Sequence, residues 1–383
     1  MEILTMQDIF KKAIYFLERG EPIAIATAVR TKGSTPQKAG ARLLVCKDGT
    51  SVGTLGGGCI EGSVWCTAKE LLNKGGTAQY LNYCMNAELA AQDGMICGGT
   101  MWFLIEPVVP NGETLTYMKA IETAFAGGKP VAWATLIHRA ENDATSTGTK
   151  LFIRDDGVTR GSLGKLELNQ GAVKRALELM ATGMNEYVAA DNGADYFIEA
   201  FTTMPFLILC GGGHIAKALA PLAKNLGFRL CIIDERQEFA NKERFPEADV
   251  LIQDKPDKAL SELSITPNTF IVVATPSHYH DDVSLEAAAR TPARYLGLVG
   301  SKRKTLLVYK HLIHKGVHID RIKKIHAPIG LDICARTPEE IAISIMAEIL
   351  MFKSGGTGQK MKLQEWQITG IEKQVNKSTV EAL

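Results

Sequence analysis

Residues 206–220, FLILCGGGHIAKALA, decide the fold of the second half of the chain. Five apolar residues precede Gly211, Gly213 and Ala216 in the spacing G-x-G-x-x-A, and a helical pattern begins at His214. Glycines allow a tight turn, and the backbone N–H groups at the start of a helix favour a phosphate group. The stretch therefore predicts a strand, a turn and a helix that hold a nucleotide-type ligand, with Gly211, Gly213 and His214 at its phosphates.

After this stretch, short apolar segments alternate with helical patterns. Such alternation is typical of a parallel sheet covered by helices on both faces. We expect an α/β fold here, a Rossmann-like doubly wound parallel sheet over residues 204–354, followed by a polar tail over residues 355–383. Thr337, Pro338 and Glu340 form a capping-box pattern that marks the start of a long helix. The expected strands are FLILC, RLCII, DVLIQ, FIVVA and RYLGLVG.

Further candidate ligand groups follow later strands of this sheet. Asp234 ends the second strand, where a carboxylate can accept hydrogen bonds from a ribose diol, and Arg236 can instead meet a 2′-phosphate. Ser301 and Lys302 open a helix after a glycine, a setting that suits a phosphate. A crevice that binds no nucleotide and a solvated basic helix face are the alternatives.

His278, His280 and Asp282 show a spacing that can hold metals in a metal-dependent hydrolase. The histidine expected next is absent, because position 283 is valine. The missing ligand favours a structural role, in which His280 and Asp281 or Asp282 cap the following helix.

The first half of the chain reads as a different kind of domain, an α+β domain over residues 1–203. It begins with a helix over residues 7–18 and a strand over 23–29, and a hairpin follows with its tip at Asp48-Gly49. A middle segment over residues 111–203 is interpreted as completing this domain. Its end, DYFIEAF, faintly resembles the earlier WFLIEP, but two short matches do not establish a repeat.

The stretch GTLGGGCIEGSVWC in this domain places Gly56, Gly57, Gly58 and Cys59 where a helix is about to begin. A thiol at a helix N-terminus ionises more readily, and a thiolate is both a nucleophile and a ligand for soft metals. Cys97 borders another glycine turn and can converge with Cys59. On composition alone, the favoured alternative for both is a small buried hydrophobe.

Composition narrows the class of protein. The 43 Lys and Arg residues balance the 42 Asp and Glu residues, which gives no global field for nucleic acid or a membrane surface. No apolar run is long enough to span a membrane, and no secretion signal is evident, so we expect a cytoplasmic protein. Eight scattered cysteines fit a reducing compartment. A homodimer is the default expectation for assembly.

Taken together and in order, several motifs resemble the XdhC/CoxI family, the xanthine dehydrogenase accessory proteins. The resemblance covers about residues 23–107 and 205–353. Two details depart from the usual family pattern: Cys334 stands where the family usually has glycine, and Pro276-Ser277 stands where Arg-Gly is common. The motifs that carry it are GSTPQKAGARLLV, GTLGGGCIEG, MICGGT, LILCGGGHIA, GLVGSKRK and HAPIGLDICARTPEEIAISIMAEI.

The resemblance implies a cofactor chaperone. Such a protein would bind the molybdenum cofactor, as molybdopterin or its dinucleotide form, and support its sulfuration by a cysteine desulfurase. It would then insert the cofactor into an apo molybdenum hydroxylase. Cys59, with Cys97, would contact molybdenum or sulfur, and the residues of the glycine fingerprint would hold the phosphate side. An NAD(P)-dependent oxidoreductase is the alternative function, because Asp234 and the fingerprint also suit a nicotinamide cofactor.

Overall fold

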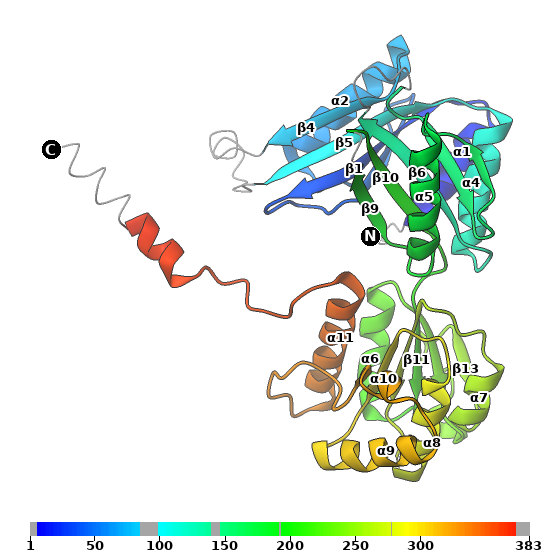
Figure 1. The fold of residues 1–383 in the computed structure, drawn as a ribbon, viewed down its shortest axis with the longest axis vertical. Coiled ribbons are helices and arrows are strands. Elements are labelled where there is room, and N and C mark those ends of the chain that lie inside the picture. Colours follow the sequence, from blue (N-terminus) through cyan, green and yellow to red (C-terminus); the bar gives the residue numbers. More distant parts are fainter. Residues whose placement is uncertain (1–5, 85–98, 139–145, 191–192, 277, 373–383) are drawn as a thin grey trace. The chain divides into compact units, whose positions relative to one another are not determined.

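The computed structural model describes residues 6–84, 99–138, 146–190, 193–276 and 278–372, and its chain forms two compact units (Figure 1). The first unit contains Met1–Phe206 and Ile265–Thr269, and the second contains Leu207–Ser264 and Phe270–Leu383. The predicted fold class is confirmed: antiparallel sheets with helices occupy the first unit, and a Rossmann-like parallel sheet occupies the second.

The second unit is built on a six-stranded sheet with the strand order β13-β12-β11-β14-β15-β16. This is the order of the dinucleotide-binding fold, in which the strand sequence reverses beside the first strand. The short strands β13 and β16 lie at opposite edges of the sheet and are only partly buried, whereas nearly all residues of the central strands are buried. The strands are β11 (Phe206–Cys210), β12 (Arg229–Ile233), β13 (Val250–Ile252), β14 (Thr269–Val273), β15 (Tyr295–Leu298) and β16 (Ile325–His326).

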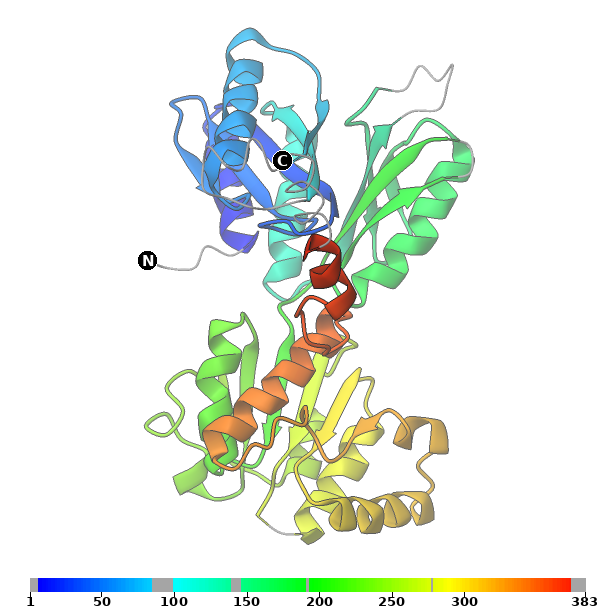
Figure 2. The same ribbon diagram turned by 90° about the vertical axis from the view of Figure 1, so that its left-hand side faces the viewer.

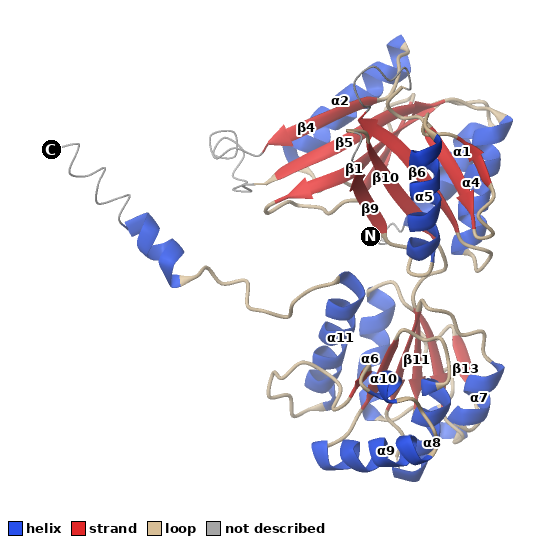
Figure 3. Ribbon diagram, in the orientation of Figure 1, coloured by secondary structure: helices blue, strands red, loops and turns tan. Residues whose placement is uncertain are grey.

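Helices flank this sheet on both sides (Figure 3). Apolar residues of the first and last of these helices pack with the central strands into one core around Phe228, Phe270 and Tyr295. The predicted capping box at Thr337 and Glu340 is present and starts the last helix. The elements are α6 (His214–Asn225), the 3-10 turn η1 (Gln237–Phe239), α7 (Pro256–Glu262), α8 (His278–Ala289), α9 (Lys302–His314), α10 (Ile319–Ile322) and α11 (Pro338–Ser354).

The first unit contains two five-stranded antiparallel sheets. The first sheet has the order β3-β2-β1-β5-β4, and the second sheet has the order β8-β7-β6-β10-β9. The first comprises β1 (Ile23–Lys32), β2 (Arg42–Cys46), β3 (Ser51–Gly53), β4 (Gln79–Cys84) and β5 (Thr100–Val108). The second comprises β6 (Val131–His138), β7 (Lys150–Arg154), β8 (Thr159–Gly161), β9 (Asn185–Ala189) and β10 (Asp195–Phe201). The accompanying helices are α1 (Met6–Glu18), α2 (Gly58–Lys74), α4 (Gly112–Phe125) and α5 (Leu166–Met180).

These two sheets are copies of one topology, so the first unit is a duplication. Each copy runs helix, three strands, helix and two strands, and the chain order of the strands within each sheet is the same. The glycines that end the third strand also correspond: Gly53 and Gly161 both have positive φ, and a Cβ on either would lie 2.3 Å from the carbonyl oxygen of Arg42 or Lys150. The faint similarity between DYFIEAF and WFLIEP is therefore real, because these segments are the equivalent strands β10 and β5.

The two repeats pack against each other within this unit (Figure 2). Helix α2 covers the outer face of the first sheet, where it contacts the alternate residues Ala24, Ala26 and Leu43, and α5 covers the second sheet in the same way. The opposite face of each sheet, with Ile25 in the first and Trp133 in the second, joins α1 and α4 in a shared core. Neither repeat buries this inner face alone, so the two depend on each other.

Within the described residues, no helix has both the length and the apolar character that crossing a bilayer demands.

Candidate functional site

The glycine turn before α2 is held in place by a carboxylate. Glu61 Oε2 accepts hydrogen bonds from the backbone N–H groups of Leu55 at 2.7 Å and Gly57 at 3.1 Å, and from the Thr54 hydroxyl at 2.8 Å. Partial burial opposes ionisation of Glu61, but these hydrogen bonds hold the pKa of its carboxyl below the usual value. Glu61 therefore places one negative charge at the turn.

The glycines of this turn differ in how closely other residues surround them. Gly56, Gly57 and Gly58 all have positive φ, a conformation that side chains with a Cβ rarely adopt. A Cβ at Gly56 would lie 2.5 Å from Pro36, whereas one at Gly57 would meet no atom of the described residues within 4 Å. Gly56 is therefore required by packing, and Gly57 leaves open space beside the start of α2.

The second repeat builds the same turn without a cysteine. Residues 161–169, GSLGKLELN, precede and open α5, and Leu163 N donates to Asn169 Oδ1 at 2.7 Å, as Leu55 N donates to Glu61. Gly164 matches Gly56, but Lys165 occupies the N-cap position that Gly57 has in the first repeat. The fold of the turn therefore does not demand Gly57, Gly58 or Cys59.

Cys59 lies in the first turn of α2 and is exposed. Composition alone favours a buried cysteine at this position, and the structure shows an exposed one. Cys97 lies outside the described residues, so the predicted convergence of the two thiols stays a prediction. Of the other cysteines that the structure describes, Cys46, Cys210 and Cys231 are buried, and burial raises the pKa of each of their thiols.

The fingerprint of the second unit forms a cavity at the carboxyl end of the sheet. Gly211 has φ +110, and a Cβ there would lie 2.4 Å from the Ala274 carbonyl oxygen, so this glycine permits the close passage of two strands. Gly213 is the N-cap of α6, and a Cβ there would have no neighbour within 4 Å in the part of the chain that the structure describes. A cavity of about 420 Å³ lies here, lined by Gly213, His214, Thr275 and Lys304 among others. It occupies the point where the strand order reverses, the usual ligand position in this fold.

Lys304 provides the cation of this cavity, and sequence reasoning singled out Lys302 instead. The Lys304 ammonium pairs with the fully buried Asp281 and donates to the Val299 carbonyl oxygen at 3.3 Å. Asp281 also accepts hydrogen bonds from the Thr275 backbone N–H at 3.1 Å and from its hydroxyl at 2.7 Å. The Asp281 carboxylate therefore links the segment after β14 to α9. The predicted helix-capping role is wrong for Asp281, because this residue lies inside the first turn of α8.

Ser301 is the N-cap of α9, and its hydroxyl accepts a hydrogen bond from Lys304 N at 3.3 Å. Lys302 is exposed and does not line the cavity, since the helix turns its side chain away from the face on which Lys304 lies. Helical periodicity places residues two apart on different faces, which explains why the first basic residue of the motif is not the one at the crevice.

Asp234 is engaged by the protein itself. Its carboxylate accepts hydrogen bonds from Gly212 N at 2.9 Å and from the Arg236 guanidinium at 2.9 and 2.8 Å. Burial opposes its ionisation, yet the Arg236 and Gly212 hydrogen bonds hold the pKa of Asp234 below its usual value. The space beside it is a cavity of only about 20 Å³. A ribose diol at Asp234 would have to displace Arg236.

Among the described residues, no group of three or more His, Cys, Asp or Glu side chains is arranged to hold a metal ion. His280 Nδ1 lies 3.6 Å from Glu235 Oε1, and the side chain of His278 is outside the described part of the chain. The hypothesis of a two-metal hydrolase therefore finds no support in the residues that can be seen.

The protein thus combines a Rossmann-like unit, which has an open cavity at the start of α6, with a duplicated α+β unit, which has an exposed thiol at a glycine turn. Its family follows from comparison with known proteins. A family model described as the XdhC Rossmann domain matches residues 207–349, and one described as the XdhC and CoxI family matches residues 16–83 and 124–189. These last two stretches are corresponding parts of the two repeats. The chain belongs to the XdhC and CoxI family.

Relatives of known name support this membership. A Bacillus subtilis strain 168 protein, named as a probable xanthine dehydrogenase subunit, is 30% identical over 87% of this chain and 94% of its own length. The molybdenum cofactor insertion chaperone PaoD of Escherichia coli strain K12 is 24% identical over 89% of this chain and 86% of PaoD. The match to YqeB of the same strain, an uncharacterised protein, is 31% identical and spans 45% of that protein's length.

A crystal structure described as a xanthine dehydrogenase from Bacillus halodurans has a related fold. It aligns with a TM-score of 0.66 and 26% identity, over 93% of this chain and 98% of that one. The similarity thus extends through both units of the chain.

Proposed function

We propose that this protein is a molybdenum cofactor chaperone that delivers the cofactor to a molybdenum hydroxylase of the xanthine dehydrogenase type. Its family contains a named molybdenum cofactor insertion chaperone and a protein named as part of a xanthine dehydrogenase. The observation that carries the proposal is the turn at Cys59. The second repeat forms the same turn with Lys165, Leu166 and Glu167, so the two glycines and the cysteine of the first repeat serve something other than folding.

The residues present fit such a cargo. An exposed thiol is a suitable ligand for a soft metal or a carrier of sulfur, and the bare Gly57 leaves room for a bulky group to approach it. The cargo also carries a phosphate, and in its dinucleotide form a nucleotide. The start of α6 at Gly213 and His214, with Lys304 nearby, offers backbone donors and a cation to that part.

Finer roles extend this proposal. Cys59 would contact molybdenum or hold the sulfur that a cysteine desulfurase supplies, while Gly211, Gly213, His214 and Ser301 would position the phosphate side. Lys302 lies on the same helix as Ser301 but would act only at the mouth of the crevice, because it is exposed. Assembly as a homodimer is part of the same proposal.

The test is the cofactor that copurifies with the protein after anaerobic expression. Molybdenum is measured by mass spectrometry and pterin by its fluorescence after oxidation. Cys59→Ala is expected to lose both, whereas Cys66→Ala, which removes another exposed thiol of the same helix, is expected to keep them. Equal occupancy in the two variants would remove Cys59 from the site, and absence of molybdenum from wild-type protein expressed without its hydroxylase would contradict the function.

A nicotinamide-dependent oxidoreductase is the competing proposal. The glycine fingerprint favours it, but the pairing of Asp234 with Arg236 and the small space beside them work against it. Titration with NADH and NADPH, followed by nicotinamide fluorescence, separates the two functions. We expect no saturable binding by wild-type protein, and tight binding of either nucleotide would favour the oxidoreductase.

A further inference from the structure

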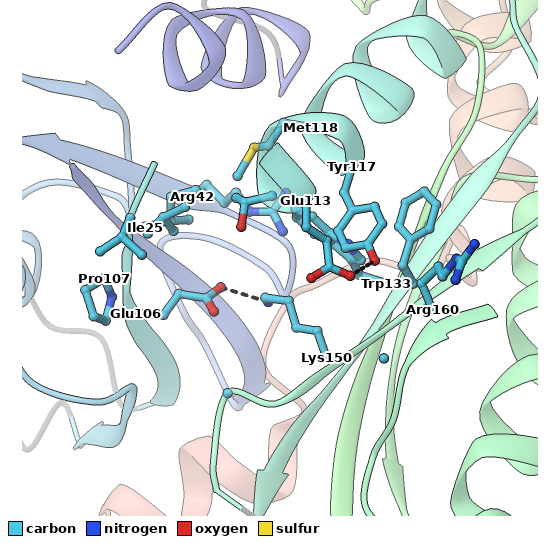
Figure 4. A pocket seen from close by; sticks show the side chains of 16 residues that line it. Ile25, Arg42, Glu106, Pro107, Glu113, Tyr117, Met118, Trp133, Lys150 and Arg160 are labelled. Carbon is cyan, nitrogen blue, oxygen red and sulfur yellow. Dashed lines mark hydrogen bonds and ion pairs between the residues drawn. The ribbon is translucent and has the colours of Figure 1, made fainter. Parts of the chain in front are cut away.

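Several buried and half-buried cations of this chain receive their acceptors from the chain itself. Arg42 pairs with Glu199, and the Lys150 ammonium lies 2.9 Å from the Glu106 carboxylate (Figure 4). Arg321 has no carboxylate partner, but its half-buried guanidinium donates to three backbone carbonyl oxygens at 3.1, 3.2 and 2.7 Å. Burying a cation without such acceptors costs free energy, so an exception to this pattern needs an explanation.

Arg294 and Lys353 of the second unit are two such exceptions. Both side chains are half-buried, and neither forms a hydrogen bond or an ion pair with any residue that the structure describes. The Arg294 Nε atom is wholly buried and has no acceptor among these residues. Burial lowers the pKa of both groups, and the charge of Arg294 lowers the pKa of Lys353 further. The two cations therefore lie close enough to repel each other.

Packing holds the Arg294 guanidinium in place. Arg294 directly precedes β15, and Lys353 lies in the last turn of α11. The guanidinium lies 5.1 Å from the centre of the Phe270 ring and 5.9 Å from that of Phe352, the chain neighbour of Lys353. Contact with aromatic faces fixes the plane of a guanidinium and leaves N–H groups at its edge free to donate. Two cations are thus positioned together, and the described residues supply no acceptor for them.

The carboxylate one turn earlier on α11 is already used by other groups. Glu348 Oε2 accepts hydrogen bonds from the Tyr295 hydroxyl at 2.7 Å and from Gly330 N at 2.9 Å, and Oε1 lies 3.3 Å from His326 Nδ1. Burial opposes ionisation of Glu348, but these partners hold the pKa of its carboxyl below the usual value. No ion pair joins Glu348 to either of the two cations. Their charge is therefore left for a group from outside the described chain.

These cations are separate from the Rossmann crevice. Phe270 and Arg294 lie at the amino ends of β14 and β15, whereas the glycine fingerprint lies at the carboxyl end of β11. Neither Arg294 nor Lys353 lines the 420 Å³ cavity beside Gly213. The two places lie at opposite ends of the parallel strands, so one ligand group cannot meet both.

The chemistry of the two side chains defines what would complement them. A guanidinium carries five N–H donors in a planar fork, an ammonium carries three, and neither can accept a hydrogen bond. A phosphate group carries nearly two negative charges at neutral pH and several acceptor oxygens, so it can balance both cations at once. A carboxylate balances only one of them. Phe352, which is 39% exposed, places this pair at the surface, where a solute can reach it.

We propose that Arg294 and Lys353 bind the phosphate group of a small molecule at the amino end of the Rossmann sheet. The guanidinium fork and the ammonium donate to the phosphate oxygens, and the negative charge removes the repulsion between the two cations. Bound phosphate links the start of β15 to the end of α11 and thereby stabilises the second unit. The inference stands apart from the proposed function, since it uses neither Cys59 nor the crevice and needs no cofactor.

The test compares the melting temperature of the full chain in sodium phosphate and in sodium chloride of equal ionic strength, by differential scanning calorimetry. Phosphate should raise the melting temperature of the wild type by about 2–4 °C more than that of Lys353→Met or Arg294→Met. Phosphate also stabilises proteins by its exclusion from their surfaces. That effect, and any phosphate bound in the crevice, is common to all the proteins compared, so the difference between wild type and variant measures this site.

Lys315→Met is the matched control, because it removes an exposed lysine at the C-terminal end of another helix, α9. It should respond to phosphate as the wild type does. Sodium acetate at the same ionic strength tests the choice of ligand and should give no additional rise. An equal phosphate response in the wild type and both site variants, or an acetate response as large as that to phosphate, would overturn the proposal. Neither result depends on molybdenum occupancy, so the outcome is independent of the proposed function.

Discussion

Glu61 shapes the glycine turn through three hydrogen bonds, and its charge is not essential to that task. Asn169 accepts the equivalent backbone hydrogen bond in the second repeat with a neutral amide. The carboxylate adds a negative charge beside Cys59 that the second repeat lacks. Lowering the pH should therefore weaken this turn in the first repeat and leave the equivalent turn of the second repeat unchanged.

Acidification is expected to loosen the turn at Glu61. Its folded pKa is lowered by hydrogen bonds that outweigh the opposing effect of burial, so its stabilisation is complete above the unfolded pKa, about 4.3, and is lost as pH falls through the folded value. Amide hydrogen exchange should show falling protection of Leu55 and Gly57 over this range. Protection that stays constant in the wild type would contradict the assignment.

The variant Glu61→Gln and the second repeat provide the controls for this experiment. The variant keeps an oxygen acceptor and does not titrate, so its Leu55 protection is expected to be nearly independent of pH. The amide of Leu163, which is bound by Asn169, should also stay protected in both proteins.

At the scale of elements, the turn before α2 can be exchanged for the turn before α5. Gly57, Gly58 and Cys59 would be replaced with the Lys-Leu-Glu of the second repeat. The new lysine should then adopt the ordinary φ of −124° that Lys165 has as the N-cap of α5. We expect a free energy of unfolding within about 1 kcal/mol of the wild type, because the hydrogen bonds donated by Leu55 N and Gly56 N have equivalents at Leu163 N and Gly164 N. Copurified molybdenum should nevertheless fall to background.

Gly53→Ala is the contrasting variant for this exchange. Its Cβ would lie 2.3 Å from the Arg42 carbonyl oxygen, so urea denaturation should show clear destabilisation. If the exchanged turn were as destabilising as Gly53→Ala, the glycines beside Cys59 would be needed for folding, and their functional interpretation would fail.

Elements with strong local signals could be predicted from the sequence, and these include the strand and helix around the fingerprint and the capping box of α11. Strands β4 and β9 are largely half-exposed and lack clear apolar alternation, so they could not be found by pattern. The duplication could not be established from the sequence, because the two repeats share topology and only short sequence matches such as GTLG and GSLG. The engagement of Asp234 by Arg236 likewise depends on side-chain contacts that no spacing reveals.

At the scale of the whole first unit, the two repeats are joined by ion pairs that cross from one to the other. Arg42 and Glu106 belong to the first repeat, and their partners Glu199 and Lys150 belong to the second. The pairs correspond to each other, since Thr27 accepts from Arg42 at 3.1 Å and its equivalent Thr135 accepts from Lys150 at 3.0 Å. The two pairs differ in burial: the Arg42 side chain is 3% exposed and that of Lys150 is 27% exposed.

This difference in burial predicts unequal costs when the cations are removed. Arg42→Met leaves the buried Glu199 without its cation and should lower the free energy of unfolding by about 3–5 kcal/mol. Lys150→Met should lower it clearly less, because water reaches Glu106, the partner of Lys150. Urea denaturation followed by tryptophan fluorescence measures both, since Trp133 lies in the shared core. The double variant Arg42→Met with Glu199→Leu removes both buried charges and should regain much of the loss. The Phe10 and Phe201 rings both contact the Arg42 guanidinium. If the double variant is as unstable as Arg42→Met alone, the lost stability therefore comes from packing around these two rings and not from an uncompensated charge.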